Sequence, residues 1–324
     1  MSDAAFEEIA DTGHQVLQRV RTAVVGMDDT LEIALAAILA GGHVLIEDVP
    51  GLGKTLAARS LAAALGLEFR RLQCTPDLLP GDVTGSYVYA PASGEFQFRP
   101  GPIFTGLLLA DEINRTTPKT QSAMLEAMAE HQVTVEGNRF ALPAPFHVIA
   151  TSNPIEYEGT YALPEAQLDR FMVRLAVGYP TVEGEAEILL QRVRRGRPDV
   201  AVAPVVDAAG LLRIQAAVER IHVDPDVARY CVALARMTRS AQRVAVGASP
   251  RGSQALLLLG RSLAALDGRA FVRPDDIKRV AVPALAHRLT LTPQAWAQEV
   301  STESIVASVV SQVPVPPTMS AGPG

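Results

Sequence analysis

The chain has 324 residues, of which 48% are hydrophobic and 20% charged, with a net charge of −6 at pH 7. This length suggests about two domains, and the acidic balance argues mildly against nucleic acid as a partner. The only cysteines, Cys74 and Cys231, exclude a disulfide framework and a zinc site. The acidic N-terminus is no signal peptide, and no apolar run reaches about 18 residues. We therefore expect a cytoplasmic protein without a membrane span.

Two helices are expected before the first core strand. Residues 3–20 carry an apolar stripe at helical spacing. After a turn that contains Gly26 and Met27, one of the two following aspartates can cap a second helix that continues to Leu39. The turn either forms a shelf for an adenine base or is simple connecting structure, and the sequence favours neither.

Residues 47–55 have the layout of a phosphate-binding loop. An apolar strand at 43–46 precedes them and a helical run begins at Lys54, which is the order expected for a P-loop. Backbone N–H groups of such a loop hold phosphate oxygens, and the helix N-terminus adds a favourable positive potential. We therefore expect ATP to be bound by the loop and the first helical turn, at Asp48, Val49, Pro50, Gly51, Leu52, Gly53, Lys54, Thr55 and Leu56.

Particular side chains of this loop have particular tasks. Lys54 can reach the β- and γ-phosphates, and the hydroxyl of Thr55 can ligate Mg²⁺. The two glycines allow backbone angles that a Cβ would forbid. The general pattern has glycine where this chain has Asp48, so the motif is incomplete. A glycine-rich turn without a ligand is the alternative, but it leaves Lys54 unexplained.

A β-hairpin is predicted between the second core strand, 68–74, and the third. Aromatic residues alternate on either side of a Pro-Ala-Ser-Gly turn, which is typical of a hairpin: they are Tyr87, Tyr89, Phe96 and Phe98. These aromatic side chains could contact a substrate or pack on their own domain.

The third core strand ends in two acids. Its apolar residues are uninterrupted, as in a strand buried on both faces of a parallel sheet, and ligands bind at the carboxyl ends of such strands. We expect Asp111 to hold Mg²⁺ together with Thr55, and Glu112 to take a proton from the attacking water. The alternative is an acidic start to the helix at 119–131, but the pair precedes that helix by several residues.

A second hairpin, at 133–141 with its turn at 136–139, leads to a buried strand at 146–152. Asn153 follows that strand and could orient the attacking water, or it could simply start a turn before proline. A short helix at 163–171 and a fifth core strand at 174–177 come next. Arg170 could stabilise phosphoryl charge only from a neighbouring subunit. Its alternative is a surface ion pair with Asp169 or Glu165.

The rest of the chain is predicted to be helical. A basic run at 192–197 and a linker to Val206 precede helices at 208–220, 226–239, 249–267 and 274–288. Ser249 can cap one of them. Arg251 lies near that helix start, where the helix dipole disfavours a cation, so it either binds a phosphate or is there by chance. We assign residues 1–200 to a nucleotide-binding core, 201–312 to a lid and 313–324 to a disordered tail.

Taken together, these motifs resemble the AAA+ ATPases, and more closely the MoxR family. The resemblance covers about residues 15–310, and it is most specific in the stretches 47–55, 98–104, 111–115, 119–128, 150–154, 163–171 and 247–251. It implies an α/β fold: a P-loop NTPase (AAA+) core with a five-stranded parallel sheet and β-hairpin insertions, followed by a C-terminal all-α lid domain.

The resemblance also implies roles. Lys54 and Thr55 match the Walker A residues, and Asp111 and Glu112 match Walker B. Asn153 matches sensor 1, Arg170 the arginine finger and Arg251 sensor 2, and the hairpins resemble the helix-2 insert and the pre-sensor-1 hairpin. Asp48 resembles what MoxR members commonly carry.

Family members are ring-forming, usually hexameric, chaperone-like ATPases that often act with a von Willebrand A domain protein. The resemblance thus implies a homo-oligomeric ring that binds ATP and Mg²⁺ between core and lid at a subunit interface and acts on a client complex. Three alternatives stay open: a nucleic-acid motor of the related MCM branch, a nucleotide-gated scaffold with little turnover, and a magnesium-chelatase-like motor subunit.

Overall fold

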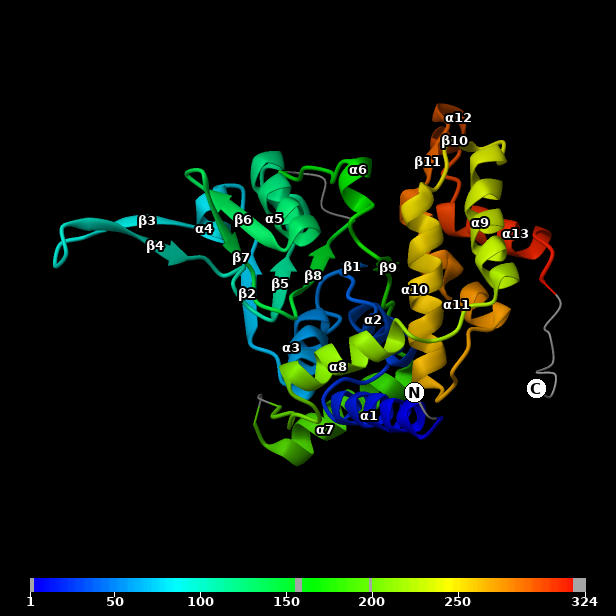
Figure 1. Ribbon diagram of the computed structural model, residues 1–324, viewed down its shortest axis with the longest axis horizontal. Coiled ribbons are helices and arrows are strands. Elements are labelled where there is room, and N and C mark those ends of the chain that lie inside the picture. The colour runs from blue at the N-terminus through cyan, green and yellow to red at the C-terminus, as the bar shows by residue number, and fades with distance from the viewer. Residues whose placement is uncertain (1–2, 155–158, 198–199, 317–324) are drawn as a thin grey trace.

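The computed structural model describes residues 3–154, 159–197 and 200–316 (Figure 1). Its central sheet consists of β1 (Val44–Glu47), β2 (Phe69–Gln73), β5 (Leu107–Asp111), β8 (His147–Ser152) and β9 (Val173–Leu175). The strand order is β2-β5-β8-β1-β9 and every pairing is parallel. The predicted five-stranded parallel sheet is therefore confirmed, with the P-loop strand β1 between β8 and β9.

Both faces of the sheet are covered. Leu107 and Leu109 of β5 belong to a cluster of buried residues that includes the helices α1 (Asp3–Arg21), α2 (Asp28–Leu39) and α3 (Lys54–Ala64). Leu108 and Ala110 point the other way, into a cluster with the helix α5 (Pro118–Glu130). The apolar run of β5 is uninterrupted because successive side chains enter two separate cores.

Two hairpins project from the core. The first, β3 (Gly85–Ala90) with β4 (Glu95–Pro100), follows the short helix α4 (Pro80–Thr84) and forms the long arm in Figure 1. The second is β6 (Gln132–Val135) with β7 (Asn138–Ala141), so its turn is only two residues long and shorter than predicted.

Aromatic packing joins the hairpins to each other. The rings of Phe98 and Phe140 are stacked with centroids 3.9 Å apart, and Asn138 Nδ2 donates to the hydroxyl of Tyr87 at 2.9 Å. Tyr89 and Phe96, farther along the arm, are 52% and 68% exposed. The aromatic residues thus divide into a pair that packs within the domain and a pair that faces solvent.

The remaining core helices are α6 (Glu165–Leu168), shorter than predicted, and α7 (Val182–Arg195). The chain after α7 is mostly helical, as predicted, and contains α8 (Ala208–Val218), α9 (Pro225–Ser240), α10 (Pro250–Leu266), α11 (Pro274–Leu285), the 3-10 turn η2 (Ala286–Arg288), α12 (Pro293–Ala297) and α13 (Thr302–Gln312). It also holds a small antiparallel ribbon, β10 (Val244–Val246) with β11 (Thr290–Leu291), which the sequence did not predict.

The local boundaries show two further differences. The residue that precedes α2 is Met27, without a side-chain cap bond, so the predicted aspartate cap is wrong. Asp28 and Asp29 lie in the first turn instead, where their charge suits the helix dipole. The predicted disordered tail lies mostly outside the described residues.

Core and lid share one hydrophobic cluster. α1 and α2 pack against α10, and a Cβ added to Gly13 of α1 would lie 2.3 Å from a methyl carbon of Leu266. Among the residues that the structure describes, none of the helices is both long and apolar enough to cross a membrane.

Candidate nucleotide site

The P-loop leaves the carboxyl end of β1 and enters α3. Gly51 and Gly53 have φ angles of 86° and 82°, in the left-handed region that glycine adopts without strain. A Cβ added to either glycine would meet nothing within 4 Å, so the space beside the loop is open. The loop and the N-terminus of α3 therefore fit a phosphate chain.

Lys54 is buried, with its ammonium against the loop. Its Nζ donates to the main-chain oxygen of Asp48 at 2.6 Å. Burial lowers the pKa of Lys54, and the nearby carboxylates of Asp48, Asp111 and Glu112 counteract this lowering. The lysine is thus held at the loop as a cation for phosphate oxygens.

Asp48 anchors the loop to the segment that follows β9. Its Oδ2 accepts from the N–H groups of Val177 and Gly178, each at 2.6 Å, and its Oδ1 accepts from the N–H of Val49 at 2.7 Å. At the position where the general pattern has glycine, this carboxylate accepts hydrogen bonds from three backbone N–H groups. The Asp48 side chain therefore anchors the loop. That Asp48 also binds ATP, as the sequence led us to expect, stays a prediction.

Asp111 lies next to the P-loop, on β5. Its Oδ2 is 3.5 Å from Thr55 Oγ1, and its Oδ1 accepts from Thr151 Oγ1 at 2.6 Å. Arg71 donates to Oδ2 at 2.6 Å. Sequence reasoning missed Thr151 and Arg71, although Arg71 and Gln73 are polar residues that alternate toward the carboxyl end of β2.

The hydroxyl of Thr55 and the carboxylate of Asp111 are hard oxygen ligands that fit Mg²⁺. The described residues contain no cluster of three or more His, Cys, Asp or Glu side chains suited to a metal ion. These two side chains would therefore suit a magnesium ion as its protein ligands.

Glu112 adopts a left-handed backbone, with φ 58° and ψ 51°, which is uncommon for a residue with a side chain. Its N–H donates to Thr151 Oγ1 at 2.9 Å, and its carboxylate accepts from Gln73 and Arg115, each at 3.0 Å. This conformation turns the acid out of the strand direction, as a base that must reach substrate water requires.

Asn153 joins the same edge of the sheet. It follows β8, whose last residue, Ser152, accepts from the N–H of Asp48 at 3.1 Å. Asn153 is buried and its main-chain oxygen accepts from Asn114 Nδ2. The structure thus brings together four predicted side chains, those of Lys54, Thr55, Asp111 and Glu112, and places Asn153 after the neighbouring strand at the same edge.

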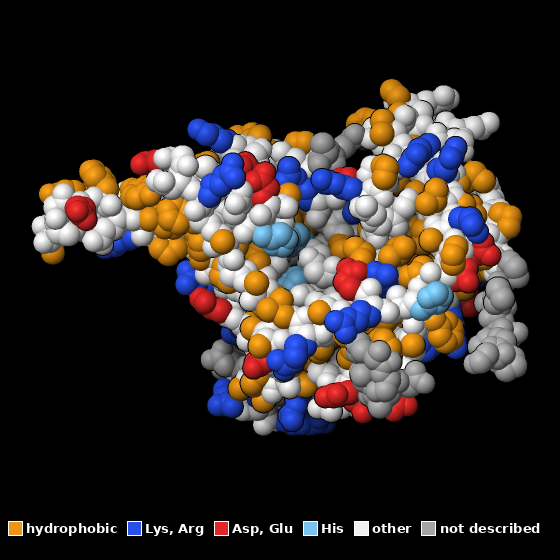
Figure 2. Space-filling model, in the orientation of Figure 1, with side chains coloured by type: hydrophobic (Ala, Val, Ile, Leu, Met, Phe, Trp, Pro, Cys, Tyr) orange, Lys and Arg blue, Asp and Glu red, His pale blue; other side chains and the backbone are white. Residues whose placement is uncertain are grey.

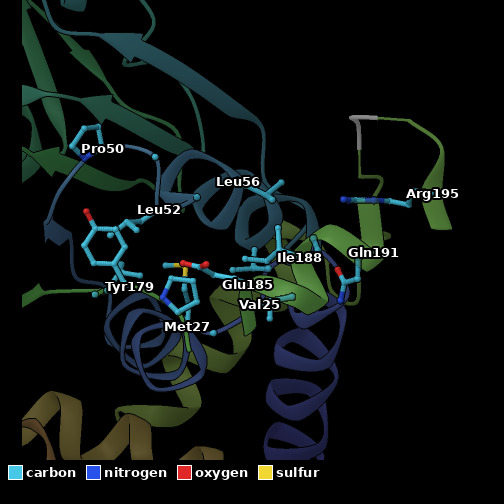
Figure 3. A pocket seen from close by; sticks show the side chains of 18 residues that line it. Val25, Met27, Pro50, Leu52, Leu56, Tyr179, Glu185, Ile188, Gln191 and Arg195 are labelled. Carbon is cyan, nitrogen blue, oxygen red and sulfur yellow. The ribbon is translucent and has the colours of Figure 1, made fainter. Parts of the chain in front are cut away.

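A cavity of about 370 Å³ opens beside the P-loop (Figure 3). Gly26 and Met27 line it, as the shelf prediction requires. Tyr179 and α7 residues such as Ile188 complete it, and sequence reasoning missed both. All its lining residues lie between Ala23 and Arg195, so within one chain the cavity is formed by the predicted core. The expected contribution of a lid at a subunit interface stays a prediction.

Arg170 and Arg251 lie at the other edge of the sheet. Val173 pairs with Val44 at the start of β1, which places the residues before β9 at the amino edge. Both arginines line a groove of about 260 Å³ with His43, Asp169 and Arg288. In Figure 2, histidine and Lys or Arg side chains border the hollow between core and lid. Neither arginine is at its own chain's P-loop.

The surface ion pair considered for Arg170 does not form with Asp169. Arg170 Nη1 donates to the main-chain oxygen of Leu125, and Asp169 pairs with Arg288. The side chain of Glu165 lies outside the described residues.

Comparisons with known proteins agree with this architecture. Residues 43–173 match the model of the "ATPase family associated with various cellular activities (AAA)", and residues 236–309 match that of an AAA lid domain. The fold and the site therefore define an AAA-type P-loop ATPase.

Two curated relatives, together with a solved structure, indicate the family within the AAA ATPases to which the chain belongs. The uncharacterised protein YeaC of Bacillus subtilis is 46% identical over 95% of this chain and 96% of its own length. Chaperone MoxR1 of Mycobacterium tuberculosis is 41% identical over 94% of this chain and 82% of its own length. A crystal structure of a Cytophaga hutchinsonii protein superposes with a TM-score of 0.89 at 36% identity, covering 96% and 97% of the two chains. The chain belongs to the MoxR family of AAA ATPases, and membership implies that it binds and hydrolyses ATP.

Proposed function

We propose that the protein forms a homo-oligomeric ring, a hexamer, that hydrolyses ATP between subunits to remodel a client protein complex. The placement of Arg170 carries the proposal. Arg170 lies at the amino edge of the sheet, whereas the P-loop leaves the carboxyl edge. Arg170 therefore cannot reach the phosphate site of its own chain, and we propose that a neighbouring copy brings its Arg170 to that site.

In this mechanism each group has one task. Glu112 accepts a proton from the attacking water, which Asn153 orients. Lys54 stabilises charge on the phosphate oxygens from within the chain, and Arg170 and Arg251 do so from the neighbour. Mg²⁺, held by Thr55 and Asp111, would neutralise charge on the β- and γ-phosphates.

The chaperone-like part of the proposal rests on the arm and on the relatives. One relative is named a chaperone, and the exposed Tyr89 and Phe96 offer an apolar surface toward the end of the arm. Movement of residues 201–312 against residues 1–200 would shift the hairpins and strain a bound client. We propose a von Willebrand A domain protein as the partner that links the ring to that client.

The test is ATPase activity measured against protein concentration and in mixtures of variants. Arg170→Ala is expected to lower kcat by about 10³–10⁵-fold. Mixing Arg170→Ala with Glu112→Gln should restore activity, because some interfaces then contain an intact acid and an intact arginine. Lys54→Ala mixed with Glu112→Gln is the control and should restore none, since both changes damage the same side. A rate per subunit that is independent of concentration, with no restoration, would contradict the ring.

A further inference from the structure

The groove that holds Arg170 and Arg251 is built from the core and the lid. The carboxylate of Asp169 joins these two parts. Asp169 Oδ1 accepts from Arg288 Nε at 2.6 Å, and its Oδ2 accepts from Ser249 Oγ at 3.0 Å. Asp169 belongs to the core segment before β9. Ser249 precedes α10 and Arg288 ends η2, so a single core side chain bonds two separate elements of the lid.

The lid side of this junction is buried. The Arg288 side chain is only 4% exposed. Its other donors reach main-chain oxygens of the core, those of Phe171 at 2.8 Å and Met172 at 3.2 Å. The neighbouring His287 Nε2 also bonds the Phe171 oxygen, at 3.0 Å. The segment that carries Arg170 is therefore clamped by two consecutive lid residues.

Both groove arginines lie within two residues of a side chain in the hydrogen bond between Asp169 and Ser249. Arg170 is the next residue after Asp169, and its buried Nε has no hydrogen-bond partner in the described part of the chain. The N–H of Arg251 donates to Ser249 Oγ at 3.1 Å, and this hydroxyl in turn donates to Asp169. A short path of bonds thus runs from the residue beside one arginine to the backbone of the other.

We propose that Asp169 is a positioning residue for the shared ATPase site. Its bonds to Ser249 and Arg288 lock lid to core, so that Arg170 and Arg251 are presented together to the nucleotide of the neighbouring subunit. A lid movement that breaks these bonds moves Arg251 away from Arg170 and releases the core segment that carries Arg170. The inference rests on the proposed function, because it assumes that the two arginines act on another subunit.

The first test is Asp169→Asn, which keeps the shape of the side chain and removes its charge. We expect kcat to fall by about 10–100-fold, the scale of a small misplacement of catalytic groups. The Kd for a fluorescent ATP analogue should stay unchanged, because the P-loop lies at the opposite edge. The control is Asp276→Asn, which weakens another largely buried pair, with Arg269, that lies wholly within the lid. That control should leave kcat unchanged.

Mixing separates positioning from loss of folding. Asp169→Asn mixed with Glu112→Gln should recover activity, since the first variant keeps an intact P-loop and the second keeps intact arginines. Asp169→Asn mixed with Arg170→Ala should recover none, because both are damaged on the arginine side. A misfolded subunit would be rescued by neither partner.

Each outcome is decisive. If Arg170→Ala and Glu112→Gln fail to complement, the shared site itself is wrong. If they complement while Asp169→Asn keeps the wild-type kcat, or is not rescued by Glu112→Gln although it folds, the positioning role is wrong. Should Asp169→Asn fail to fold, Ser249→Ala tests the same path with the ion pair intact. It should lower kcat by about 3–10-fold and complement only Glu112→Gln, whereas wild-type kcat in this variant would overturn the inference.

Discussion

The two edges of the central sheet carry different halves of one chemistry. The carboxyl edge holds the P-loop and the acids Asp111 and Glu112, which we propose hold phosphate and Mg²⁺ and activate water. The amino edge holds Arg170 and Arg251, which can only stabilise negative charge. Because a parallel sheet separates its two edges by the length of its strands, neither half can complete the other within one chain.

The two edges are also anchored differently. Asp48 ties the P-loop to the backbone of residues 177 and 178, within the core. Asp169 ties the arginine groove to Ser249 and Arg288, in the lid. Core packing therefore supports the phosphate site, whereas the position of the lid governs the arginines. The following predictions, from the largest effect to the smallest, test this division.

At the carboxyl edge, Glu112→Gln should lower kcat by about 10²–10⁴-fold while ATP still binds, because an amide cannot accept the proton of water. Steady-state ATPase rates and nucleotide titration measure the two quantities. The control is Glu126→Gln on the exposed face of α5, which should match the wild type. Client activation that survives Glu112→Gln unchanged would favour a nucleotide-gated scaffold.

At the amino edge, three buried histidines, His43, His147 and His287, should make stability depend on pH, because burial lowers the pKa of each. Burial lowers the pKa of His43 to about 3 and of His147 to about 4. Below the usual pKa of about 6.5 the unfolded chain takes up protons that the folded chain refuses, so stability is lost as the pH falls. At pH 5 the loss is about 2 kcal/mol per histidine.

Urea unfolding at pH 7, 6 and 5 measures this loss. The variant His147→Gln removes one of the three groups and should show a shallower decline over the same range. A decline as steep as in the wild type would show that His147 does not contribute.

The anchor of the P-loop is tested by Asp48→Gly, which restores the general P-loop pattern. The N–H groups of Val177 and Gly178 then lose their acceptor, and the free energy of unfolding should fall by about 1–3 kcal/mol. ATP should also bind more weakly, because the segment released from Asp48 continues directly into Tyr179, which lines the cavity beside the P-loop. Chemical denaturation and nucleotide titration provide the measurements. If an Asp77→Gly control in an exposed loop behaves the same way, the anchoring role is wrong.

The smallest expected effects concern two aromatic residues of the first hairpin. Phe98→Ala removes the ring stacked on Phe140 and should cost about 0.5–1.5 kcal/mol beyond the lost burial. Phe96→Ala, at an exposed position, should leave the melting temperature unchanged but reduce client activation. Thermal unfolding with a client assay compares the two. Full client activity in Phe96→Ala would remove the exposed ring from the proposed client surface.

Whereas the five-stranded sheet was implied by the family resemblance, the sequence by itself determined the P-loop, the buried strand β5 with the acids at its end, and both hairpins. Each of these depends on local spacing: glycines beside Lys54, an unbroken apolar run before Asp111, and alternating aromatic residues. Backbone geometry is decided within a few residues, so such patterns are readable along the chain.

Only the tertiary structure decided which partners these residues have. Arg71 reaches Asp111 across 40 positions, and Asp48 reaches Val177 across 129. Arg288 reaches Asp169 across 119 positions and two domains. Hydrogen bonds and ion pairs of this kind follow from the packing of distant elements. The identity of a charged residue does not show which distant residue it will contact. The edge of the sheet at which Arg170 and Arg251 lie was settled in the same way, by the register of β9 against β1 and by the docking of the lid on the core.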